Sequence, residues 1–182
     1  MSTRHLVLVA GLAACADRPP PRGLDAETSK AVYEGALREI KVIATPKGNA
    51  PDSLHWERRL YLNQIIMSPV DSTGPKLHDA AWLEKVVNAG LVDGYCGQPP
   101  AAACPEGTAR MFASLGTPWT REGDTAVVET GMVAERPDTK VTLGVFRTML
   151  LVRDAESGAW RVFDRGTPRY LDYTPPDSSP GS

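Results

Sequence analysis

Apolar residues recur at helical spacing in the first half of the chain. One such series shares a single helical face and comprises Val32, Tyr33, Ala36, Leu37 and Ile40. Thr28 or Ser29 is the expected cap of this helix. A second series, Trp82, Leu83, Val86 and Val87, begins after Asp79, the expected N-cap, and ends before Gly90. The pattern therefore predicts two amphipathic helices, with a short strand over residues 59–63 between them.

From residue 109 the period changes to the two-residue alternation of strands. Long strands are expected over 125–134, 141–153 and 159–165, joined by short polar turns as an antiparallel meander. The alternation places Glu129 with Val127, Gly131 and Val133 on one face of the first strand. Residues 149–152 are apolar on both faces, which predicts a central strand covered on both sides. The aromatic side chains of Trp119, Trp160 and Phe163 are expected in the core.

Three segments of this second half carry a resemblance to a known superfamily: residues 123–128, 146–153 and 157–163. Helices followed by such a meander resemble the nuclear transport factor-like, or cystatin-like, superfamily. The resemblance covers residues 109–166 and implies an α+β fold, with N-terminal helices packed on a curved antiparallel β-meander (the cystatin-like cone). The helical half, including Tyr61, departs from the enzymes of that superfamily. The alternative is another α+β layout of helices on an antiparallel sheet.

The pattern of the first residues is typical of an export signal. A short head containing Arg4 precedes an uncharged apolar run over 6–14, about half the length that a membrane-spanning helix needs. The stretch Leu12-Ala13-Ala14-Cys15 resembles the lipobox of bacterial lipoproteins. That resemblance implies cleavage before Cys15 and attachment of lipid, including palmitate, to this residue. An ordinary secretory signal is the alternative interpretation.

The domain organisation follows from these elements. We expect a lipoprotein signal peptide over 1–14, a lipid anchor and proline-rich tether over 15–27, one α+β domain over 28–173, and a disordered tail over 174–182. Ala16 follows the anchor cysteine, and in the lipobox family a non-acidic residue there favours the outer membrane of a Gram-negative envelope. The location expected is therefore the cell envelope, with the domain in the periplasm.

The net charge and the number of cysteines limit which partners, disulfides and metal sites are expected. The formal net charge is -2, without the basic excess that nucleic-acid binding requires, so nucleic acid is not an expected partner. The chain has three cysteines; with Cys15 assigned to the anchor, Cys96 and Cys104 remain as an expected disulfide in an oxidising compartment. Two cysteines without a histidine between them are too few ligands for a metal site, so neither a metal nor a cofactor is expected.

Catalytic candidates are sparse. Glu129 and Asp164 are the acidic strand residues that an acid–base enzyme of the resembled superfamily could use, while Glu129 could equally form a cross-strand ion pair with Arg147. His78 is expected at a solvent-exposed helix entry, and His55 in a polar surface loop. No nucleophile elbow, phosphate-binding loop or zinc-protease motif occurs in the sequence.

Three functions remain open at this point. The first is a non-enzymatic, membrane-anchored envelope lipoprotein that binds a small apolar ligand or an envelope protein. The second is a pocket enzyme of the isomerase or dehydratase type. The third is a structural or assembly accessory of the envelope. Convergent ionisable groups in a deep cavity on the covered face of the sheet would favour the enzyme.

Overall fold

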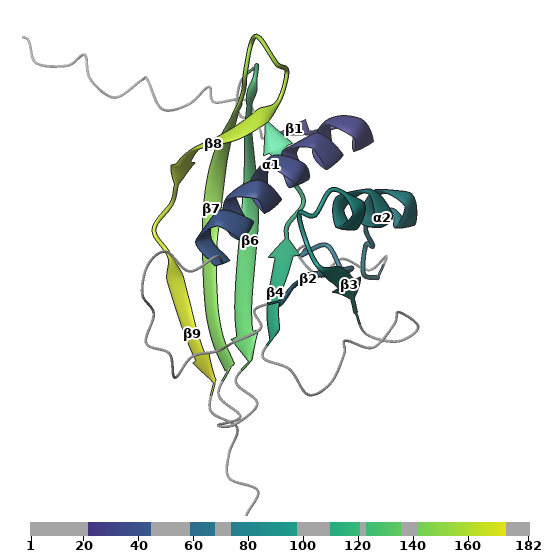
Figure 1. The fold of residues 1–182 in the computed structure, drawn as a ribbon. Helices are drawn as coiled ribbons and strands as arrows, with labels where there is room; N and C mark the ends of the chain where they lie inside the picture. The colour runs from purple at the N-terminus through teal and green to yellow at the C-terminus, as the bar shows by residue number, and fades with distance from the viewer. Residues whose placement is uncertain are drawn as a thin grey trace, which may run out of the picture.

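The computed structural model describes residues 22–44, 59–67, 74–97, 110–120, 123–135 and 142–173. Two helices and nine strands occur in these ranges (Figure 1). Their bounds are β1 Arg22–Gly23, α1 Ala26–Ala44, β2 Arg59–Asn63, α2 Ala80–Asn88, β3 Gly94–Cys96, β4 Arg110–Leu115, β5 Trp119–Thr120, β6 Thr125–Glu135, β7 Thr142–Arg153, β8 Trp160–Arg165 and β9 Arg169–Tyr173. The α+β class is confirmed. The expected tether over 15–27 is too long, because β1 and the start of α1 fall within it.

The predicted meander is present and forms the larger part of one mixed sheet. β6, β7 and β8 pair antiparallel in succession, and β9 continues along the same side of β7. The central position predicted for β7 is thus confirmed, but the predicted cover on both sides is wrong: Met149 and Leu151 are buried beneath α1, whereas Leu150 and Val152 on the other face are only half-buried. The sheet is not purely antiparallel, because β2 lies parallel to both β3 and β4. A helix connects β2 to β3, and such a crossover returns the chain in the same direction, which produces a parallel pair.

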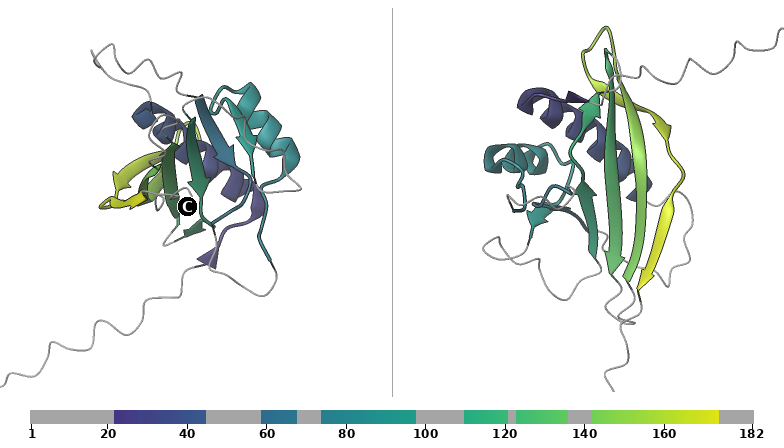
Figure 2. Two further views of the ribbon diagram at one scale, coloured as in Figure 1. Left: turned by 90° about the horizontal axis from the view of Figure 1, so that it is seen from below. Right: turned by 180° about the vertical axis from the view of Figure 1, so that it is seen from behind.

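Both helices lie on one side of the sheet. In the view from behind (Figure 2), β6 and β7 face the viewer and α1 lies beyond them. The alternation predicted for β6 is confirmed, since Ala126, Val128 and Thr130 are buried on the α1 side. Thr130, the polar member of this set, donates its hydroxyl to the carbonyl of Arg147 at 3.2 Å. This bond satisfies the hydroxyl inside an apolar layer.

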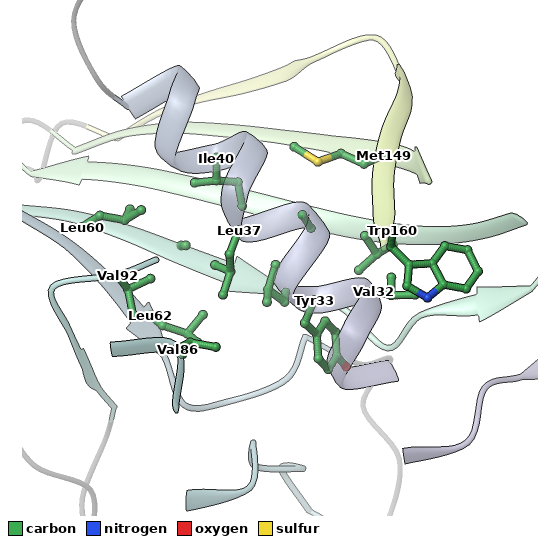
Figure 3. Close-up of a cluster of buried hydrophobic side chains, with 14 of the residues drawn as sticks. Val32, Tyr33, Leu37, Ile40, Leu60, Leu62, Val86, Val92, Met149 and Trp160 are labelled. Atoms are coloured by element: carbon green, nitrogen blue, oxygen red, sulfur yellow. The ribbon is translucent and has the colours of Figure 1, made fainter. Parts of the chain in front are cut away.

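Helix α1 packs closely against the sheet through the apolar face predicted from its spacing (Figure 3). Val32, Ala36 and Leu37 are completely buried between the helix and the strands. Gly35 permits the close approach: a Cβ atom at this position would lie 2.6 Å from the carbonyl oxygen of Trp160. The sequence pattern marks the apolar face, whereas the role of Gly35 depends on where β8 passes.

The residue that caps α1 differs from the prediction, whereas the residue that caps α2 agrees with it. Asp25, and not Thr28 or Ser29, caps α1, because its Oδ1 accepts the Thr28 N–H at 2.8 Å. The cap of α2 is the predicted Asp79, whose side chain accepts the Trp82 N–H at 2.9 Å. Gly90 follows α2 with φ +65°, a left-handed conformation that favours glycine.

Phe163 is not part of the core, contrary to the prediction, since it is 77% exposed. The cause is the alternation of β8 itself: Trp160 and Val162 face the buried side, where Val162 pairs with Leu151, so Phe163 lies on the opposite, outer face. The pairing shifts by one residue at this point, because Leu150 pairs with Asp164 and Phe163 has no opposite residue. Trp160 is buried as predicted, and Trp119 is half-buried.

Candidate functional site

The two carboxylates predicted as catalytic candidates do not lie on the face covered by α1. Glu129 pairs in register with Thr148 on the opposite face of the sheet, and its side chain is 59% exposed. Asp164 is exposed on β8 and lies opposite Leu150, which pairs with Val127 on that same outer face. Neither carboxylate therefore projects into the apolar layer beneath α1.

The expected ion pair between Glu129 and Arg147 is wrong. Arg147 pairs in register with Thr130, one position further along the ladder, and thus lies on the other face of the sheet. Glu129 instead contacts Arg169 of β9, with 3.5 Å between Oε1 and Nη2. Both side chains are largely exposed to solvent, so the pair is a surface feature.

The layer between α1 and the sheet is apolar in the part of the chain that the structure describes. Its members come from both helices and from the central strands. The most deeply buried large side chains include Leu37, Leu62, Leu115, Met149 and Leu151. No group of three potential metal ligands occurs among the described residues. This interior therefore has the composition of a packed core.

A buried aromatic cluster lies where α1 meets the start of α2. The ring of His78 contacts Tyr33 edge-on, with centroids 4.8 Å apart, and lies 4.9 Å from the ring of Trp82. His78 is only 7% exposed, so the predicted surface position is wrong. The spacing of His78 and Trp82, four residues apart across a helix start, was the signal that could have indicated their contact.

Burial changes the acid–base behaviour of this cluster. Desolvation lowers the pKa of His78 from 6.5 to about 4, which keeps the imidazole neutral at pH 7. Desolvation raises the pKa of Tyr33 to about 12. The His78 Nε2 and the Trp82 Nε1 atoms are buried without a hydrogen-bond partner. Unpaired buried nitrogens destabilise a fold, which singles out this cluster from the rest of the core.

Above the cluster, a surface pocket of about 330 Å³ separates α1 from α2. Its lining consists of Glu27, Lys30, Ala31, Glu34, Asp79, Ala81, Trp82 and Lys85. Ion pairs cross it: Lys85 lies 2.7 Å from Glu34, and Lys30 lies 3.7 Å from Asp79. Trp82 lies beneath the pocket and is only 3% exposed, so most of the named lining residues are charged. Such a pocket can accommodate a polar or charged group of a partner, and it does not suit a purely apolar ligand.

The other predicted site residues are the three cysteines and His55. Cys96 is buried at the end of β3, whereas Cys104 lies outside the described residues, so their pairing stays a prediction. Cys15 and His55 also lie outside the described residues. No helix within the described ranges combines the length and the apolar character needed to cross a membrane.

Comparisons with protein-family models, with curated protein sequences and with solved structures give no match to this chain.

Proposed function

We propose that this protein is a lipoprotein of the cell envelope, anchored through lipid on Cys15 and carrying its domain in the periplasm. The support is the lipobox-like stretch ending at Cys15, together with the apolar run before it. Two or three acyl chains attach a protein stably to a membrane, whereas one chain does so only marginally. In an envelope with two membranes, Ala16 favours the outer one.

The domain itself acts as a binding module, without catalysis or cofactor, and the pocket between α1 and α2 receives a protein partner. The observation that carries this proposal is a pocket between two helices whose rim carries charged side chains of both signs: Glu27, Lys30, Glu34, Asp79 and Lys85. Charges of both signs at fixed positions give a protein interface its specificity. Of the two ligands open from the sequence, a small apolar molecule has less support, because the rim is charged.

The alternative of a pocket enzyme has little support from the positions of its carboxylates. Glu129 and Asp164 are solvent-exposed, whereas the mechanism would require burial in an apolar pocket to shift their pKa values.

The finer fold that we propose is a variant of the cystatin-like cone, and the long helix lying across a meander supports it. The parallel pairing of β2 is a feature that the resemblance had not led us to expect.

Site-specific cross-linking in the native envelope tests the pocket. A photoreactive amino acid replaces Ala81, an exposed residue of the pocket lining, in the full-length protein. The matched control carries the same group at Asn88, exposed at the other end of α2. We expect one discrete adduct, identified by mass spectrometry, from position 81 and none from 88. Identical adducts from both positions, or none from 81, would contradict the proposal.

A further inference from the structure

The chain joins the sheet only a short distance after the expected anchor residue. Arg22 and Gly23 form β1, which pairs antiparallel with β5 at one edge of the sheet. Cys15 precedes Arg22 by seven residues. A fully extended chain of that length spans at most about 25 Å. If Cys15 carries lipid, the β1 edge is therefore held within this distance of the membrane surface.

The pocket between α1 and α2 begins a few residues after β1. Leu24 packs against the core and Asp25 caps α1, so the connection from β1 to the helix is fixed as well. Glu27 is the first residue of the pocket lining in chain order, and it follows Cys15 by twelve residues. Twelve extended residues span at most about 43 Å, or about one and a half diameters of a small domain. The rim of the pocket cannot lie farther than this from the lipid.

The pocket by itself offers a partner only weak binding. Its volume of about 330 Å³ is near the lower end of the range for small-molecule sites. On its rim, the side chains of Glu27 and Lys85 are 83% and 66% exposed. Charge contacts of such solvent-exposed groups stabilise a complex little, because water screens them. The rim can therefore select a partner by its charges, but it does not hold a partner tightly.

A shared membrane compensates for a weak contact. Two proteins held at one membrane surface meet at a high effective concentration, which raises the occupancy of their interface without any added contact. A partner dissolved in the periplasm gains no such advantage from the anchor of this domain. The short chain between Cys15 and Glu27 thus favours a partner that is itself at the membrane.

We infer that the protein that occupies the pocket between α1 and α2 is itself embedded in, or lipid-anchored to, the membrane that holds Cys15. This inference rests on the proposed lipid attachment and on the proposed role of the pocket as a binding site. The part of the partner that enters the pocket lies within about 43 Å of the membrane surface, because the chain between Cys15 and Glu27 reaches no farther.

Photo-cross-linking from position 81 tests this inference by comparing anchored with released protein. The released form carries Cys15→Ser behind an ordinary secretory signal, so that the full mature chain enters the periplasm without lipid. Both forms carry the photoreactive residue in place of Ala81 and are produced at equal levels. We expect the adduct yield of the anchored form to exceed that of the released form by about tenfold or more. Any adduct of the released form should sediment and float with the membranes.

A lengthened tether is the matched control, because it keeps the anchor. About forty glycine and serine residues inserted after Asp17 lengthen the chain between Cys15 and β1 roughly sevenfold, which lowers the effective concentration roughly tenfold. The adduct yield should fall several-fold, while the incorporation of labelled palmitate stays unchanged.

The outcomes separate this inference from the two proposals on which it rests. Anchored protein that incorporates no lipid would contradict the anchor, and anchored protein that gives no adduct from position 81 would contradict the role of the pocket; either result would remove the inference as well. An adduct of the released form that stays in the soluble fraction would overturn the inference alone. Equal adduct yields from the anchored, lengthened and released forms would also overturn it.

Discussion

The imidazole of His78 lies against the indole of Trp82, with the ring planes inclined by 35° and no hydrogen-bond partner for either buried side-chain nitrogen of the pair, Nε2 and Nε1. This contact connects the N-terminal end of α2 to the buried face of α1, because Tyr33 of α1 contacts both rings. The neutral form of His78 is the one that fits this environment. Acid should therefore destabilise the junction of the two helices.

The first prediction concerns the pH dependence of stability. His78 titrates at about 4 when folded and near 6.5 when unfolded, so between these values the unfolded chain binds a proton that the folded protein does not. The free energy of unfolding should therefore decrease as the pH falls from 6.5 to 4, by up to about 3 kcal/mol. Urea denaturation of wild type and His78→Phe at pH 7 and pH 4.5 measures this difference. An equal decrease in both proteins would mean that His78 is not its source.

The second prediction concerns the surface pair on the outer face. Glu129→Gln and Arg169→Met should each cost little, and a double-mutant cycle should give a coupling of about 0–1 kcal/mol, because both side chains are solvent-exposed. The matched cycle with Arg147→Met should give none, since Arg147 lies on the opposite face. Thermal or urea denaturation measures both cycles. Coupling of Glu129 to Arg147 but not to Arg169 would require a different strand register.

The third prediction concerns the close approach of α1 to the sheet. Gly35→Ala would place a methyl group 2.6 Å from the Trp160 carbonyl oxygen and 2.9 Å from Leu151 Cδ2. Overpacking of this kind costs about 1–3 kcal/mol, which should outweigh the gain of about 1 kcal/mol in helix propensity. Gly23→Ala is the control, because a Cβ atom added at that position would have no neighbouring atom within 4 Å. A stabilised Gly35→Ala protein would refute the packing described for α1.

The fourth prediction concerns the anchor. Cys15→Ser should abolish incorporation of labelled palmitate and release the protein from the membrane fraction, because the thiol is the site of attachment that the lipobox resemblance implies. Cys96→Ser is the control and should still be labelled. Metabolic labelling followed by membrane fractionation measures both effects. Unchanged labelling of Cys15→Ser would exclude Cys15 as the lipidated residue.

The fifth prediction is a disulfide between Cys96 and Cys104. Alkylation of the unfolded mature protein without reductant should leave its intact mass unchanged, and prior reduction should add two alkyl groups. The bridge would close a short loop and contribute about 2–3 kcal/mol to stability. Two alkylated thiols without reductant would disprove the pairing and would also weaken the assignment of the domain to an oxidising compartment.

The sequence by itself determined the features that depend on neighbouring residues. Helical spacing identified the buried face of α1, Asp79 identified the start of α2, and two-residue alternation identified β6 and its two faces. These elements are encoded locally, because a helix turn or a strand pleat relates residues only a few positions apart. The order of strands in the meander followed too, because short turns leave few ways to connect them.

Only the tertiary structure decided which distant residues meet. Glu129 contacts Arg169 because β9 runs beside β7, and a shift of one position in the ladder is enough to place Arg147 on the other face. Phe163 is exposed because it lies on the outer face of β8, which neither α1 nor α2 covers, and His78 is buried because α1 crosses the start of α2. Each of these outcomes depends on the register or packing of segments far apart in the chain, and no short-range pattern specifies either.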